Sequence, residues 1–138
     1  MVSELTEALV VACGGRAIVW PQNPVRLDHS SEPQPDLAVL RRRADFYANG
    51  ERPGPDDILL LIEVADSSLR FDQTVKLPLY ARAGIAELWI VDLKHRVLDA
   101  YRDPAGNGYR ETTTHRPGDQ LALVLAPEIV VTLGFMFG

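Results

Sequence analysis

Residues 58–84 read ILLLIEVADSSLRFDQTVKLPLYARAG and change from apolar to polar at Glu63. The apolar run before this residue, Ile58–Ile62, has the length and composition of a strand that is covered on both faces. A carboxylate at the end of such a strand is costly to bury unless a metal ion or a lysine lies beside it. We therefore expect Glu63 to have a positively charged partner.

The second half of the segment supplies a lysine. Asp72 and Lys76 are four residues apart, which places them on the same face of a helix. We expect this helix to include Thr74–Ala83 and to end at Gly84. Pro78 lies inside it and lacks a backbone N–H group, which predicts a kink or an open carbonyl near Thr74. A strand that ends in an acid thus leads into a helix that carries a lysine.

Length and composition restrict the class of protein. The chain has 138 residues, is 46% hydrophobic and carries a formal net charge of -5, which suits a single domain over residues 1–138. The acidic balance argues against a protein that coats nucleic acid, so any contacts with DNA are expected to be local. The sequence lacks a membrane-spanning run and a basic signal peptide, and Cys13 is its only cysteine, which together predict a cytoplasmic protein without membrane contact.

Hydrophobic patterning predicts an α/β fold with a mixed sheet. A first helix is expected at Ser3–Val11, and Arg41–Asp57 has no apolar period and is expected to be a long connection. The expected strands are Ala17–Trp20, Val25–Leu27, Leu37–Leu40, Ile58–Val64, Glu87–Asp92, Val97–Arg102 and Tyr109–Thr114. The first two are expected to pair, and the helix before Glu87 favours parallel pairing of the strands on either side of it. The apolar tail after Leu121 is expected to close the core.

Several motifs in this pattern resemble the Uma2 family of restriction-endonuclease-like proteins. They are Pro35-Asp36, Ile62-Glu63-Val64 with Ser67-Ser68, Asp72, Lys76-Leu77, Leu79-Tyr80, Ala83-Gly84 and Glu87–Asp92. The resemblance implies the fold of the PD-(D/E)XK nucleases, a mixed β-sheet flanked by helices, and an ancestry of metal-dependent phosphodiester hydrolysis. It also implies that Asp36, Glu63 and Lys76 are the catalytic residues.

Two features depart from the superfamily pattern. The superfamily lysine stands two residues after the acid, where this chain has Ala65, so Lys76 on the following helix takes its place, as in the Uma2 pattern. Family members also carry an N-terminal section with a helix and a further acidic residue. We expect this section to be shorter here, with Glu4 or Glu7 as candidates for that acid.

Phosphodiester hydrolysis gives these residues a chemical role. A divalent cation neutralises charge on the phosphoryl oxygens and lowers the pKa of an attacking water. Mg²⁺, or Mn²⁺ in its place, takes oxygen ligands, which the carboxylates of Asp36 and Glu63 and the backbone carbonyl of Val64 would supply. We expect parallel neighbouring strands to bring the two carboxylates to one edge of the sheet, and Lys76 to orient the water or offset charge on the phosphate.

Each candidate residue also has a purely structural explanation. An acid after a proline, as at Asp36, is typical of a turn, and Lys76 can pair with Asp72 on an exposed helix face. The run Arg41–Arg43 suits contact with a phosphate backbone, but it also suits a solvated connection. The three histidines lack a metal-ligand spacing and are expected to face solvent; they are His29, His95 and His115.

The consecutive apolar residues Leu88, Trp89 and Ile90 need cover on both faces of their strand, which predicts core packing or a subunit contact and, with the resemblance, a homodimer. The leading interpretation is a magnesium-dependent endonuclease that acts on DNA. The alternatives are a catalytically silent nuclease-fold module for binding or assembly, and a metal-dependent phosphodiesterase for RNA or small substrates. A site open to solvent favours the enzyme, and a closed, mutually neutralised one favours the module.

Overall fold

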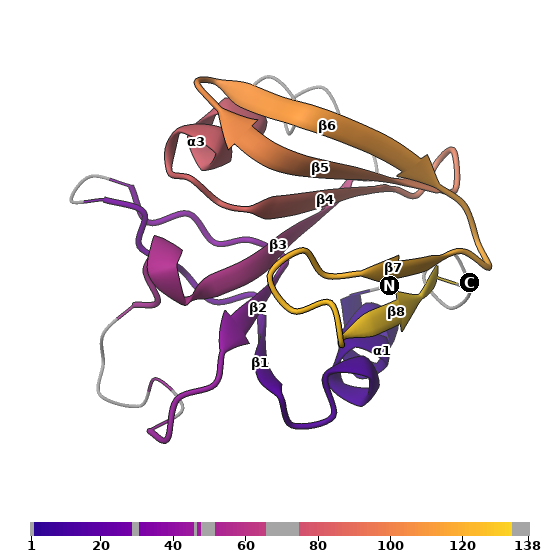
Figure 1. The fold of residues 1–138 in the computed structure, drawn as a ribbon, viewed down its shortest axis with the longest axis horizontal. Helices are drawn as coiled ribbons and strands as arrows, with labels where there is room; N and C mark the ends of the chain where they lie inside the picture. Colours follow the sequence, from indigo (N-terminus) through magenta and orange to yellow (C-terminus); the bar gives the residue numbers. More distant parts are fainter. Residues whose placement is uncertain (1, 29–30, 46, 48–51, 66–74, 134–138) are drawn as a thin grey trace.

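A six-stranded mixed sheet organises the chain (Figure 1). The computed structural model describes residues 2–28, 31–45, 47, 52–65 and 75–133, and only the backbone of residues 2–4. The strands lie side by side in the order in which they occur in the sequence. They are β1 (Ala17–Pro21), β2 (Leu37–Arg41), β3 (Ile58–Ala65), β4 (Glu87–Asp92), β5 (Val97–Ala105) and β6 (Gly108–His115). The α/β class with a mixed sheet, predicted from the sequence, is confirmed.

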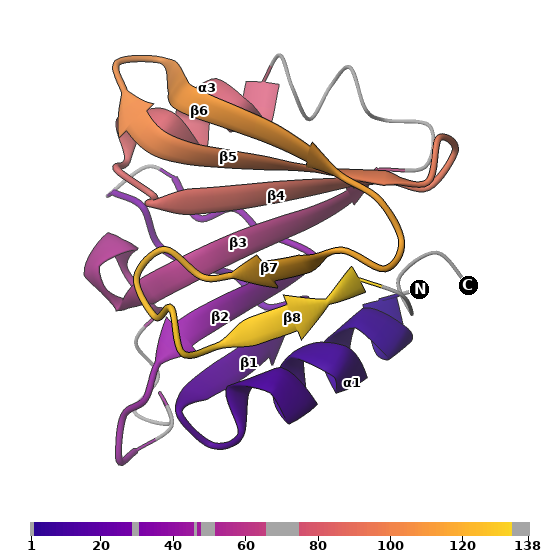
Figure 2. The same cartoon turned by 45° about the vertical axis from the view of Figure 1, so that its right-hand side comes forward.

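β3 and β4 are parallel, whereas the other neighbouring strands of the sheet are antiparallel. The connection between them contains the helix α3 (Leu77–Arg82), as the strand–helix–strand pattern predicts. Their register places Ala65, the last residue of β3, opposite Asp92, the last residue of β4. The carboxyl ends of the two central strands therefore lie together, at the right-hand side of Figure 2.

Both faces of the two central strands are covered by this chain. Three elements cover one face, namely α1 (Val2–Cys13), β7 (Gln120–Ala122) and β8 (Val130–Thr132) (Figure 2). Trp89 points into this core, whereas Leu88 and Ile90 point into the core beneath α3 on the other face. All three are at most 1% exposed. The cover that we had assigned in part to a second subunit is thus supplied by the chain itself.

One local prediction is wrong. Val25–Leu27 is not a strand, because its backbone N–H groups bond to loop carbonyls, Val25 to Pro33 and Arg26 to Pro53, and β1 pairs with β2 instead. Val25 is buried and Leu27 is partly buried, with the exposed Arg26 between them, so burial alternates here without a strand.

The structure describes only part of the helix in which Pro78 is expected to cause a kink or an open carbonyl near Thr74, so this stays a prediction. α3 begins at Leu77, so Pro78 stands in its first turn, where a missing N–H group costs little. One wide π-type turn at Val75 and Lys76 precedes α3, and Thr74 lies outside the described residues. Within the described ranges, no helix is long and apolar enough to cross a membrane.

Candidate active site

Asp36 and Glu63 lie at the same edge of the sheet. Asp36 directly precedes β2, and Glu63 stands two residues before the end of β3. These strands are antiparallel, with Leu37 opposite Ile62, so the start of one lies beside the end of the other. The parallel pairing that we expected for these two strands is wrong, but the antiparallel pairing brings the carboxylates to one edge equally well.

A backbone contact fixes the first of these carboxylates. The N–H group of Val64 donates a hydrogen bond to Asp36 Oδ2 at 2.7 Å. Because Val64 directly follows Glu63, this bond connects Asp36 to the same short piece of β3. The three residues that sequence motifs assigned to metal binding, Asp36, Glu63 and Val64, are therefore adjacent in space.

Glu63 is almost fully buried, at 1% exposure, and both of its oxygens accept hydrogen bonds. Lys76 Nζ lies 3.2 Å from Oε1, and the hydroxyl of Tyr80 donates to Oε2 at 2.6 Å. The side chain of Lys76 is 28% exposed, so it leads from the buried carboxylate toward solvent. The positive partner expected for Glu63 is therefore Lys76.

The environment of Glu63 favours its protonated form. Burial raises the pKa of the Glu63 carboxyl above its ordinary value, because the charged carboxylate is poorly solvated in the interior. The hydrogen bond from Tyr80 and the positive charge of Lys76 lower this pKa, and the negative charge of Asp36 raises it further. The net shift is upward, so the two donors offset only part of the cost of burial.

Tyr80 was not predicted as a site residue, although the sequence contains a signal for it. Lys76 and Tyr80 are four residues apart, the spacing that places two side chains on one face of a helix. Once Lys76 is directed at Glu63, Tyr80 is the next residue that can reach the same carboxylate. Asp72 lies outside the described residues, and so does its expected pair with Lys76.

The oxygen atoms at this edge fit a magnesium ion. Mg²⁺ is usually held by one or two carboxylates, with waters and substrate phosphates as its other ligands. Asp36 and Glu63 would supply two carboxylates, and the carbonyl of Val64 would supply a third hard oxygen. In the described ranges, no three His, Cys, Asp or Glu side chains form a larger metal-binding group. Glu7 is exposed on α1, which packs on the opposite face of the sheet from Tyr80, so it does not add a ligand.

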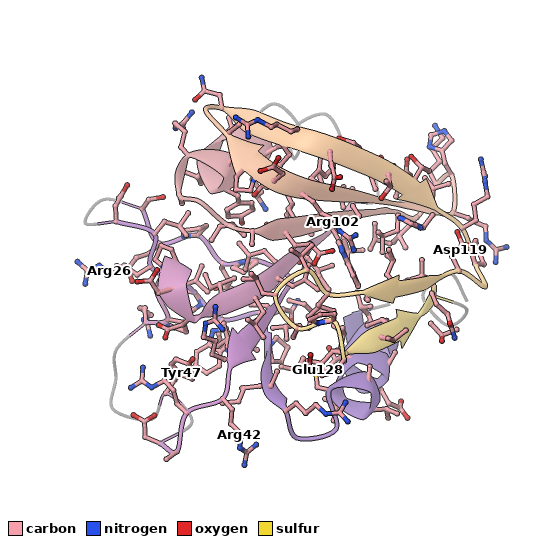
Figure 3. The ribbon with its side chains drawn as sticks, in the orientation of Figure 1. Arg26, Arg42, Tyr47, Arg102, Asp119 and Glu128 are labelled. Atoms are coloured by element: carbon pink, nitrogen blue, oxygen red, sulfur yellow. The ribbon has the colours of Figure 1, made fainter. Side chains whose placement is uncertain are left out.

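The arginine run lies away from this edge. Arg41 ends β2, whereas Asp36 precedes it, so the two are separated by about 17 Å along the strand. Arg41 and Arg42 donate to the backbone carbonyls of Asp56 and Gly15, at 2.8 and 3.0 Å. Figure 3 shows Arg42 at the outer surface near Tyr47. This run therefore does not adjoin the candidate active site.

A second buried acid, Glu87, holds the C-terminal hairpin to the sheet. It is fully buried and accepts hydrogen bonds from Trp89 Nε1 at 2.8 Å, Arg102 Nε at 2.8 Å and the N–H group of Val124 at 2.9 Å. Arg102, labelled in Figure 3, also donates to the carbonyl of Ala122 at 2.8 Å. We assign this cluster a structural role that the sequence analysis did not anticipate.

Comparison with known proteins shows the family and the fold of the chain. The model of the Uma2 family, described as "Putative restriction endonuclease", matches residues 1–134. The chain belongs to the Uma2 family. This membership confirms the resemblance seen in the motifs and extends it from the central segment to nearly the whole chain.

The Uma2 chain also resembles a solved structure. The crystal structure is of a protein from Anabaena variabilis ATCC 29413, described as "a putative nuclease belonging to DUF820", and the match has a TM-score of 0.68 and 16% identity. It covers 99% of this chain and 77% of the Anabaena chain. At this identity the likeness establishes a shared fold and not a shared substrate. No curated protein matches the sequence.

Proposed function

We propose that this Uma2 protein is a magnesium-dependent endonuclease that hydrolyses phosphodiester bonds in DNA, with Mn²⁺ as an alternative ion. The observation that supports it is the convergence of Asp36, Glu63 and Lys76 at one edge of the sheet, with the ammonium 3.2 Å from the buried carboxylate. Membership of a family described as a restriction endonuclease agrees with this chemistry.

The residues of the chain have distinct roles in this proposal. When bound, the cation neutralises phosphoryl charge and lowers the pKa of the attacking water. Asp36, Glu63 and the carbonyl of Val64 would hold it. The Val64 N–H group orients Asp36, and Tyr80 fixes the rotamer of Glu63. Lys76 would place positive charge where negative charge develops on the phosphate.

One observation favours a second candidate, the silent binding or assembly module. Glu63 is closed off from solvent, and each of its oxygens already accepts a hydrogen bond, from Lys76 or from Tyr80. In this alternative the three side chains neutralise one another and hold the helix segment on the sheet. The module would then keep the fold of a nuclease without binding a metal ion.

Metal-dependent cleavage separates the two candidates. Purified protein is incubated with supercoiled plasmid, single-stranded DNA and RNA in Mg²⁺, Mn²⁺ or EDTA, and Asp36→Asn, purified identically, reports contaminating nucleases. The enzyme is supported by plasmid nicking that requires the metal and is lost in Asp36→Asn. Cleavage of RNA alone would favour the alternative substrate class, and no metal-stimulated cleavage of any nucleic acid would support the silent module.

The homodimer and the cytoplasmic location stay predictions. The apolar residues of β4 that suggested a subunit contact are already buried within one chain, so a dimer would need another surface. Light scattering at micromolar concentration measures the mass directly. A mass near the 15.3 kDa of one chain would contradict the dimer.

A further inference from the structure

Among the described residues, the turn between β4 and β5 is an exposed basic segment at the edge that carries the candidate active site. Its sequence is Leu93-Lys94-His95-Arg96, and the last three residues are exposed. The chain as a whole carries a net charge of -5. Among the described residues, no carboxylate pairs with Lys94 or Arg96. We call Lys94, His95 and Arg96 the basic turn.

Asp92 holds the middle of the basic turn in place. Its Oδ1 accepts a hydrogen bond from the backbone N–H of His95 at 3.1 Å, and its Oδ2 lies 2.7 Å from His95 Nδ1. Asp92 is only 6% exposed, whereas the side chain of His95 is 63% exposed. With Nδ1 turned toward Asp92, the Nε2 side of the ring faces away from the protein. Asp92 thus holds the imidazole at Nδ1, while Nε2 faces solvent.

The surroundings of Asp92 favour its ionised form. Burial raises the pKa of Asp92, but hydrogen bonds from His95 and from the backbone of Lys94 outweigh it and bring the pKa below its ordinary value. Asp92 is therefore ionised at neutral pH. Both of its oxygens contact His95, so its negative charge interacts within the turn and does not face a ligand.

The basic turn begins beside the candidate active site. Asp92 is opposite Ala65 in the parallel pairing of β3 and β4, and the Leu93 N–H group donates to the Ala65 carbonyl at 3.1 Å. Glu63 stands two residues earlier on β3, so its Cα lies about 8 Å from that of Asp92 on standard strand spacings. Alternation along the strands places both side chains on the face that carries α3. Figure 2 shows the turn just beyond the ends of the two strands.

We propose that the basic turn binds the phosphate backbone of duplex DNA next to the bond positioned at Asp36 and Glu63. This inference rests on the proposed nuclease function. Each DNA strand presents one phosphate per about 3.4 Å of helix axis, so a duplex lying over the site places neighbouring phosphates over the turn. Lys94 and Arg96 supply charge, and His95 supplies a fixed hydrogen-bonding group. The turn lies beyond Asp92, whose Cα is already about 8 Å from that of Glu63, so its residues would bind a flanking phosphate and not the reacting one.

The salt dependence of DNA binding tests the proposal without relying on cleavage. A fluorescent duplex of about 20 base pairs is titrated with protein in EDTA by anisotropy, over a series of salt concentrations. Removing two phosphate contacts in Lys94→Gln/Arg96→Gln should reduce the slope of log K against log salt by about 2. His95→Gln should weaken binding by about fivefold, the scale of one hydrogen bond. Thermal melts check that each variant is folded.

A charge-matched variant makes the result specific. Arg42→Gln/Arg43→Gln removes the same charge at the far end of β2, and should leave the slope unchanged. An unchanged slope in the turn variant, or an equal loss in both variants, would overturn the proposal. If the parent cleaves or binds DNA and the turn variant behaves like it, only this inference fails. If the parent neither binds nor cleaves DNA, both the proposed function and this inference are wrong.

Discussion

Replacing Lys76 with methionine should separate the catalytic and structural roles of the candidate site. The change keeps the length of the side chain and removes the charge that lies 3.2 Å from Glu63 Oε1. Two unit charges at this distance attract by at most about 5 kcal/mol at an effective dielectric constant of about 20. The lysine side chain is 28% exposed, and solvent screens part of this attraction. We therefore expect a loss of about 1–3 kcal/mol in the free energy of unfolding at neutral pH.

The loss of stability in Lys76→Met should depend on pH. Without the lysine charge, the pKa of Glu63 rises further above its already raised value. A group whose pKa is higher in the folded state stabilises the fold at low pH, and this contribution is lost as the pH rises through the folded-state pKa. The variant should therefore be closer to the parent at pH 5 than at pH 8, as urea unfolding at the two pH values would measure.

Lys76→Met should also lower the rate of cleavage. Loss of one electrostatic contact to the transition state lowers rates by about 100-fold or more. Plasmid nicking in Mg²⁺ is compared at a temperature where the variant remains folded. Arg82→Met, which removes a positive charge from an exposed position at the end of α3, serves as the control and should cleave like the parent. A folded Lys76→Met protein with the parent's cleavage rate would remove this lysine from the catalytic machinery.

Three further predictions concern the buried acids. Tyr80→Phe removes a 2.6 Å hydrogen bond to a buried carboxylate and should cost about 1.5–3 kcal/mol in the free energy of unfolding, measured by urea denaturation. Because the pKa of Glu63 is raised above 4.5, the parent should lose stability relative to Glu63→Gln as the pH rises above this value; equal pH profiles would show that Glu63 ionises as freely as in the unfolded chain. Glu87→Gln should lower stability by about 2–4 kcal/mol, because it removes the charge that Arg102 faces, while metal-stimulated cleavage per folded molecule stays unchanged.

The central part of the fold is predictable because its signals are local. The apolar run Ile58–Ile62 identifies a strand with two buried faces, and the helix before Glu87 indicates the parallel partner. The partner of Glu63 could also be predicted, since burying a carboxylate requires compensation and Lys76 is the nearest lysine that follows it in the sequence. Each of these inferences spans fewer than about 30 residues, within one supersecondary unit.

The errors and omissions arise where distant residues decide the outcome. The segment Val25–Leu27 alternates between apolar and polar residues as a strand does. However, the backbone N–H groups of Val25 and Arg26 donate to the carbonyls of Pro33 and Pro53 in loops. Asp36 and Glu63 reach one edge through an antiparallel pairing that no local pattern specifies. The bond from Val124 to Glu87 joins residues 37 positions apart, so the sequence marks Glu87 only as part of a strand. Long-range pairing of this kind depends on the whole fold and not on propensity.

The Glu87 cluster has a consequence for local opening of the chain. The hairpin of β7 and β8 is small and would be expected to detach easily from the sheet. Detachment would take the Val124 N–H group and the Ala122 carbonyl away from Glu87 and Arg102, and would expose five apolar side chains that are at most 4% exposed. These are Leu121, Leu123, Ile129, Val131 and Leu133. The hairpin amides should therefore exchange hydrogen with solvent at rates close to those of β4, as one cooperative unit that includes the centre of the sheet.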